Sequence, residues 1–214
     1  MPIYKHLKIN AQTALWVWRI NESEIDLEQQ IQLTPDCNSR LKSLRCTNQR
    51  KAFLAIRCLL KSLEVPTTDL YYDTNGKPHL KSGTHISISH AQNYAAVALS
   101  KTEVGLDIEQ HRSKIKRVVH KFINPNDQLP TEEIPDLITL WCTKEAVYKA
   151  LSVPGVSFRS DIVVRIDSDK KWSASYQDQT FDCELANSVL WSDQLDNIFG
   201  AGKPQRFIRN RSYI

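Results

Sequence analysis

Three short apolar segments separated by brief polar breaks constrain the fold of this chain more than any other feature. They cover residues 85–89, 94–99 and 103–109, and the breaks between them lie at residues 91–93 and 100–102. Runs of this kind, rich in β-branched and small apolar side chains, predict β-strands. Since connections this short join neighbouring antiparallel strands, we expect the three strands to form an antiparallel meander.

Two long helices are expected on either side of these strands. The first runs from Thr47 to about Leu63, with Thr47 as its cap, and the second from Asp136 to Leu151, ended by Pro154-Gly155. Further strands are predicted early in the chain and after the second helix, at residues 14–20, 162–166, 172–176 and 180–185. The interleaving of strands and helices predicts a mixed α+β fold.

A second stripe of the first helix is basic, because Arg50, Arg57 and Lys61 share it. We interpret Arg57 and Lys61 as a solvated face. The whole chain has 28 Lys and Arg against 24 Asp and Glu, a formal charge of +4. This excess permits an anionic ligand or an acidic partner, but it is too small to indicate nucleic acid binding.

Cysteine usage and hydropathy point to the reducing cytoplasm. The five cysteines are odd in number and show no C-x-x-C spacing, which indicates reduced, mostly buried thiols and argues against a zinc site. The N-terminus has no apolar segment typical of a signal peptide, and no run approaches the 18 apolar residues of a membrane span. We therefore expect a cytoplasmic protein that has no membrane contact.

The predicted strand Val104–Glu109 carries two carboxylates on one face. Asp107 and Glu109 are two residues apart, so they lie roughly 6.5–7 Å from each other along the strand. Like charges this close are unfavourable unless they are solvated or bridged by a cation, and Mg²⁺ prefers carboxylate and phosphate oxygens. Taken alone, the hexapeptide is more simply explained as the solvated face of an edge strand.

Three further segments carry side chains suited to phosphate chemistry. On the second helix, Trp141, Glu145 and Lys149 follow one another at intervals of four, which also fits an ordinary Glu–Lys surface pair. His90 ends a predicted strand, where a structural role is equally common. Lys77 lies in a turn that Asn75-Gly76 and Pro78 make rigid and that holds this lysine outward.

Taken in order, these four segments resemble the marks of the 4'-phosphopantetheinyl transferase superfamily, in particular the longer, monomeric type that activates surfactin synthetase. That family has a G-K-P turn, an S-H-S motif, a G-[VI]-D-[IV]-E strand and a W-x-x-K-E-x-x-x-K helix. The matching segments are Gly76-Lys77-Pro78, Ser89-His90-Ala91, Gly105–Glu109 and Trp141–Lys149. The resemblance implies two similar α+β halves related by a pseudo-twofold axis, residues 1–101 and 102–214, with the active site in the cleft between them.

The resemblance also implies roles for individual residues. Asp107, Glu109 and Glu145 would hold Mg²⁺, while His90 and Lys149 would contact the phosphates of coenzyme A. Lys149 would also help to deprotonate the incoming serine or stabilise developing charge. The 3'-phosphoadenosine end of coenzyme A would be bound on the N-terminal side, by Arg50, Lys77, Pro78 and Ser89. Asp127 stands where the family has a glutamate proposed as the base, and its side chain is one carbon shorter.

The implied reaction transfers the phosphopantetheine arm of coenzyme A to a serine of an apo-carrier protein, next to an acidic helix of that carrier, and releases 3',5'-ADP. Two alternatives stay open. One is a different Mg²⁺-dependent phosphotransferase acting on diphosphates, and the other is an inactive module that binds coenzyme A or a carrier protein. The chain departs from the family at Ser87, where an Asn is usual, and at Ala91, where a Ser is usual.

Overall fold

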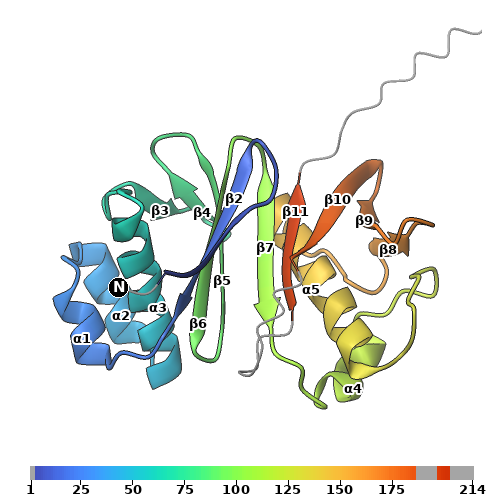
Figure 1. Ribbon diagram of the computed structural model, residues 1–214, viewed down its shortest axis with the longest axis horizontal. Helices are drawn as coiled ribbons and strands as arrows, with labels where there is room; N and C mark the ends of the chain where they lie inside the picture. The colour runs from blue at the N-terminus through green and yellow to red at the C-terminus, as the bar shows by residue number, and fades with distance from the viewer. Residues whose placement is uncertain (1–2, 187–196, 203–214) are drawn as a thin grey trace, which may run out of the picture.

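The computed structural model describes residues 3–186 and 197–202, and it contains two antiparallel sheets that stand side by side (Figure 1). The first sheet has the strand order β1-β2-β6-β5 and the second β7-β11-β10-β9-β8. Their strands are β1 (Ile3–Lys8), β2 (Thr13–Arg19), β5 (His85–Ala91), β6 (Tyr94–Ser100), β7 (Val104–Glu109), β8 (Ile162–Ile166), β9 (Trp172–Tyr176), β10 (Gln179–Ala186) and β11 (Asn197–Gly202).

Helices cover the outer side of each sheet. On the first sheet they are α1 (Glu24–Gln29), α2 (Pro35–Ser43) and α3 (Thr47–Ser62), beside a hairpin of β3 (Leu70–Tyr72) and β4 (Pro78–Leu80). On the second sheet they are α4 (Ile115–Val118), the 3-10 turn Val119–Lys121 and α5 (Ile134–Leu151). This arrangement confirms the predicted mixed α+β fold. In the described residues, no helix combines the length and apolarity needed to span a membrane.

Three apolar cores hold these layers together. One lies between α3 and the first sheet, and one between α5 and the second sheet. The third core joins the two sheets. Leu106 and Ile108 of β7 pack there against Leu15 and Val17, on the face of the first sheet that is turned away from α3. This last core explains why β7 lies against the first sheet although it belongs to the second.

The meander prediction is therefore wrong for its third strand. Strands β5 and β6 pair as antiparallel neighbours, as expected, but β7 pairs with β11 in the second sheet. The segment from Asn197, which sequence patterns left unplaced, supplies the strand that takes β7 as its neighbour. Thr47 is also not a helix cap, since the N-cap position of α3 is occupied by Cys46, without a side-chain hydrogen bond.

Candidate active site between the two sheets

Two serine hydroxyls of β5 connect the first sheet to β7. The Ser87 Oγ accepts a hydrogen bond from the Leu106 N–H at 2.9 Å, and the Ser89 Oγ accepts one from the Ile108 N–H at 3.3 Å. Both serines are buried. Side-chain oxygens thus satisfy two backbone donors of β7 on the side where this strand has no ladder partner.

Asp107 lies between these two contacts, and its side chain is buried rather than solvated. Its Oδ1 accepts hydrogen bonds from Lys149 Nζ of α5 at 2.7 Å and from Ser89 Oγ at 2.9 Å. Lys149 Nζ also donates to the Leu106 carbonyl at 3.0 Å. No N–H or O–H group of the described residues reaches the other carboxylate oxygen, Oδ2. The strand and helix motifs predicted from sequence therefore meet at one ion pair.

The two remaining carboxylates lie near Asp107. Burial raises the pKa of Glu145 to about 7, and the charge of Asp107 adds to this effect. Burial also raises the pKa of Glu109, again with a contribution from Asp107. Because the charge of Asp107 acts on both glutamates, a cation at this place would stabilise their ionised forms.

His90, at the end of β5, lies close enough to this group for the charges of Lys149 and Asp107 to act on it. Its pKa is lowered, first by desolvation from the surrounding protein and then by the positive charge of Lys149, with Asp107 opposing the shift. Its ring is nevertheless exposed to solvent. His90 and Lys149 thus lie at the edge of the carboxylate group, where they are accessible to an anion.

A cavity of about 410 Å³ opens beside His90 and Lys149, and its wall includes β5 of the first sheet and the C-terminal end of α5. Among the described residues, the charged or titratable side chains of its wall are all basic; they are Arg40, Arg57, Lys77, His90 and Lys149. Apolar and aromatic side chains complete the wall, among them Phe53, Tyr72 and Tyr148. Such a lining suits an anionic ligand that also has an apolar or aromatic part.

Arg50 does not line this cavity. Its Nε donates to Glu24 Oε1 at 2.7 Å and its Nη1 to the Leu41 carbonyl at 2.7 Å. Two other arginines, Arg40 and Arg57, line the cavity. Arg57 is buried, so the solvated interpretation of this residue is wrong, and its guanidinium lies 3.3 Å from the Phe53 ring centroid. Arg40 is exposed and lies 4.0 Å from the Tyr72 ring centroid.

Lys77 is turned inward, contrary to the outward position expected of it. Its Nζ donates to Glu103 Oε2 at 2.8 Å and to the Ala150 carbonyl at 2.9 Å. The same turn contacts α5 again through Asn75, whose Nδ2 donates to the Ser152 carbonyl at 3.4 Å. Lys77 and Pro78 still line the cavity, and together with Asn75 the turn ties the first half of the chain to the end of α5.

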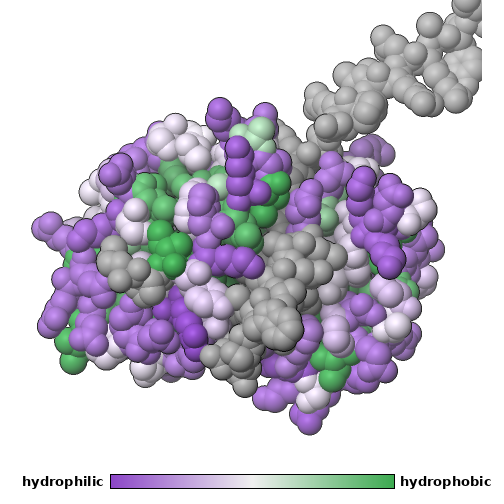
Figure 2. Space-filling model, in the orientation of Figure 1, coloured by the Kyte–Doolittle hydropathy of each residue, from purple (hydrophilic) through white to green (hydrophobic). Residues whose placement is uncertain are grey.

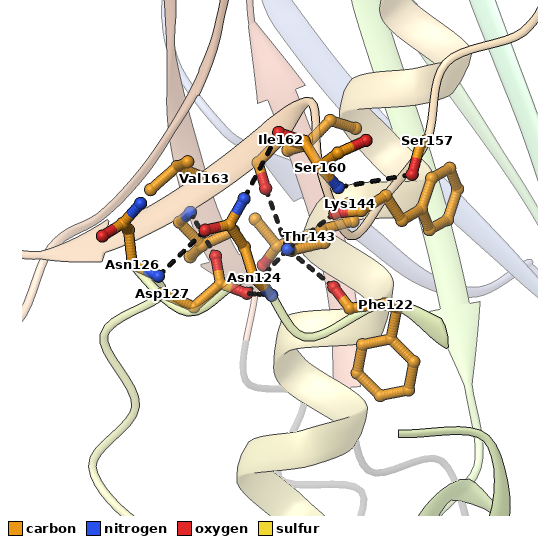
Figure 3. A network of polar contacts seen from close by, with 12 residues as sticks. Phe122, Asn124, Asn126, Asp127, Thr143, Lys144, Ser157, Ser160, Ile162 and Val163 are labelled. Atoms are coloured by element: carbon orange, nitrogen blue, oxygen red, sulfur yellow. Dashed lines mark hydrogen bonds and ion pairs between the residues drawn. The ribbon is translucent and has the colours of Figure 1, made fainter. Parts of the chain in front are cut away.

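Asp127 lies apart from the carboxylate group, in an internal network with Lys144 (Figure 3). Both side chains are almost completely buried, and Lys144 Nζ donates to Asp127 Oδ2 at 2.6 Å. The remaining carboxylate contacts come from the backbone N–H groups of Asn124 and Val164, each at 2.8 Å. With its oxygens occupied in this way, Asp127 is part of the structural core, which argues against the base role that its position implied.

Lys144 was not assigned a role from sequence. Besides Asp127, its Nζ donates to three backbone carbonyls, those of Phe122, Phe158 and Ile162. Burial lowers its pKa, and the hydrogen bond and charge of Asp127 oppose the shift. The sequence signal that could have singled out Lys144 is its place in the helix motif, directly before Glu145. Lys144 fixes α5, which carries Glu145 and Lys149, to two loops.

No three His, Cys, Asp or Glu side chains among the described residues are arranged as a preformed metal site. The side chains nevertheless fit a hard divalent cation. Asp107 presents a buried oxygen without an N–H or O–H donor, and its charge contributes to raising the pKa of both Glu109 and Glu145. Carboxylate oxygens of this kind, together with substrate phosphates, are the ligands that Mg²⁺ prefers.

Two comparisons with known proteins bear on the class of this chain. Residues 103–197 match the family model of the 4'-phosphopantetheinyl transferase superfamily. This segment contains β7 and α5, and the match agrees with the resemblance that the motifs predicted. The chain is also 24% identical over 154 residues to the 4'-phosphopantetheinyl transferase gsp of Aneurinibacillus migulanus. That alignment covers 61% of this chain and 65% of the relative, so the chain spans slightly less than two thirds of it.

Proposed function

We propose that this protein transfers the 4'-phosphopantetheine arm of coenzyme A to a serine of an apo-carrier protein, in an Mg²⁺-dependent reaction that releases 3',5'-ADP. The observation that carries the proposal is the position of the basic cavity directly beside the group of three carboxylates, with Lys149 bordering both. Coenzyme A has the matching parts. Its adenosine carries a 3'-phosphate and a 5'-diphosphate, and the chemistry occurs at the diphosphate.

The cavity supports binding of the nucleotide end. Arg40 is the exposed arginine of its wall, and Lys77 and Arg57 add positive charge deeper in. Hydrogen bonds to charged groups each contribute about 1.5–3 kcal/mol, so a 3'-phosphate in this cavity would be bound selectively. The apolar and aromatic walls are suited to the adenine ring.

The carboxylate group supports the chemical step. Asp107, Glu109 and Glu145 would hold Mg²⁺, which when bound acts as a Lewis acid and neutralises charge on the diphosphate. Lys149 and His90 neutralise further charge at the transferred phosphoryl group. Phosphoryl transfer needs little from a protein beyond such positioning and neutralisation. Asp127 takes no part in this account, because its oxygens are bonded internally.

The surface around the cavity supports docking of a carrier protein. Most of the face shown in Figure 2 is hydrophilic, and hydrophobic residues form small separate patches. Among the exposed large hydrophobic residues, Tyr148 and Val153 lie at the cavity. A carrier with an acidic helix would meet basic residues there, and these apolar side chains would pack beside its serine.

The test is incubation with coenzyme A, Mg²⁺ and a panel of apo-carrier proteins, read out by intact mass of the carrier. A mass gain equal to the phosphopantetheine arm, in at least one carrier, is expected. Binding of coenzyme A without any mass gain would instead identify an inactive binding module. Equal use of coenzyme A and 3'-dephospho-coenzyme A would favour a broader diphosphate phosphotransferase.

A further inference from the structure

Ser89 lies outside the cavity wall, although the family resemblance assigned it to coenzyme A. Its neighbours Ile88 and His90 line the cavity, whereas Ser89 is buried, with 6% of its surface exposed. Side chains alternate along a strand, so Ser89 points to the side opposite Ile88 and His90. On that side are Asp107 and Lys149, which are the polar groups its hydroxyl contacts.

The hydrogen bonds of the Ser89 hydroxyl determine where its proton points. Its Oγ accepts from the Ile108 N–H at 3.3 Å and lies 3.2 Å from Lys149 Nζ, which can only donate. A hydroxyl has two acceptor sites and one proton. Since these two donors occupy both acceptor sites, the proton is directed to Asp107 Oδ1, 2.9 Å away.

These contacts fix the orientation of the Asp107 carboxylate. Oδ1 accepts hydrogen bonds from the Ser89 hydroxyl and from the Lys149 ammonium group. Oδ2 is therefore the oxygen without an N–H or O–H donor among the described residues. We propose that Ser89 is a positioning residue, which holds Asp107 so that Oδ2 is presented to the metal ion. The proposal rests on the proposed function, because that function makes Asp107 a metal ligand.

Ser87 provides a matched control. It lies on the same strand, is also buried, and accepts the Leu106 N–H of β7 at 2.9 Å. Because Ser87, unlike Ser89, borders the cavity, the two variants are compared at saturating coenzyme A. Ser87→Ala and Ser89→Ala therefore remove equivalent links between the two sheets, and each leaves one backbone N–H of β7 without its acceptor. We expect both variants to lower the melting temperature by a similar few degrees. Only Ser89→Ala also releases the Asp107 carboxylate.

The first measurement is the affinity for Mn²⁺ in the presence of coenzyme A. Mn²⁺ serves as the probe for the Mg²⁺ site, and its binding is monitored by electron paramagnetic resonance. Groups that orient a metal ligand typically change metal affinity 10–100-fold. Ser89→Ala is expected to weaken Mn²⁺ binding at least about tenfold, and Ser87→Ala less than about twofold. Equal weakening by both variants, or unchanged affinity in Ser89→Ala, would overturn the proposal.

The second measurement separates this proposal from the proposed function. Crystal structures of the two variants report the orientation of the Asp107 carboxylate without reference to activity. We expect a rotated carboxylate in Ser89→Ala and the original orientation in Ser87→Ala. An unmoved carboxylate in Ser89→Ala would refute the positioning role even if Mn²⁺ binds. Absence of Mn²⁺ binding in the wild-type protein would instead refute the metal-dependent function, and the crystal structures would still decide the role of Ser89.

Discussion

Lys144 and Asp127 form the most deeply buried ion pair described in this protein, with 0% and 1% of their side chains exposed. Bringing two charges into a protein interior is costly, and the cost is offset only when hydrogen bonds satisfy the remaining donors and acceptors. Here three carbonyls and two backbone N–H groups do so. The pair thereby holds α5 against the loops that precede and follow it.

Asp127→Asn tests whether this aspartate is structural or catalytic. Removing one partner of a buried pair leaves an uncompensated charge and typically costs about 3–5 kcal/mol. We expect urea denaturation to show a loss of that size, and the turnover of the folded variant to remain within a few-fold of wild type. Lys144→Met should destabilise the protein similarly. Wild-type stability combined with a hundredfold loss of turnover would restore Asp127 as the base.

The arginines show where sequence patterns stop being informative. Arg50 and Arg57 lie on one stripe of α3, two turns apart, and sequence alone gives no reason to treat them differently. In the fold, Glu24 of α1 reaches Arg50, whereas Arg57 is covered by Phe53 and Tyr72. Which partner an arginine meets depends on helices and loops far away in sequence, so its role could not be predicted from the motif.

Arg40 and Arg50 form a matched pair for testing recognition of the 3'-phosphate. Arg40 is exposed in the cavity wall, and Arg50 is bonded to Glu24 outside it. Arg40→Gln should raise the KM for coenzyme A about tenfold, because it removes one charge-assisted contact, and should leave the KM for 3'-dephospho-coenzyme A nearly unchanged. Arg50→Gln should change neither value by more than about twofold. The reverse pattern in steady-state kinetics would return the phosphate contact to Arg50.

At the scale of elements, the site depends on how closely β7 approaches α5. A Cβ built on Gly105 of β7 would lie 1.7 Å from the carbonyl oxygen of Ala146 and 2.9 Å from the backbone nitrogen of Ala150. Only glycine fits where β7 comes this close to α5, since the atoms in the way belong to the helix backbone and cannot move aside as a side chain could. The glycine of the strand motif thus allows Asp107 to reach Lys149 on the neighbouring helix.

Gly105→Ala is expected to force β7 and α5 apart. Overpacking typically costs 1–3 kcal/mol, and a contact with helix backbone should reach at least about 3 kcal/mol. Gly83→Ala is a suitable control, because Gly83 has φ +79° and open space around it, so its cost is limited to about 1–2 kcal/mol of backbone strain. Chemical denaturation of the two variants compares these costs. Equal and small losses would show that β7 and α5 have room to separate.

Most strands and both long helices follow from local patterns, because their apolar side chains repeat at the period of the element that buries them. The strand β8 (Ile162–Ile166) and the strand β9 (Trp172–Tyr176) have the predicted bounds. The pairing of β7 did not follow, because its partner β11 lies about 90 residues later in the chain. Strand order reflects such distant contacts, for which short segments carry no signal.

At the scale of the whole molecule, the two halves meet at opposite ends of the candidate site. Ser87 and Ser89 bind β7 at one end, and Lys77 and Asn75 bind the end of α5 at the other. The motifs of β7 and α5 meet at Asp107 and Lys149, whereas Arg40 and Arg57 of the cavity could be found only in the assembled structure. Whether the halves are related by a pseudo-twofold axis, with a boundary near residue 101, stays a prediction.

The measurement that tests the central claim most directly is the rate at which the Asp107→Asn variant modifies a carrier protein. The rate is measured with coenzyme A and limiting Mg²⁺, and the intact mass of the carrier reports it. Asparagine keeps the Oδ1 acceptor for Ser89 and Lys149 and removes the charge that we assign to metal binding. We predict that the folded variant loses about a thousandfold or more in rate, roughly 4 kcal/mol in transition-state stabilisation. A variant that modifies the carrier at nearly the wild-type rate would contradict the account.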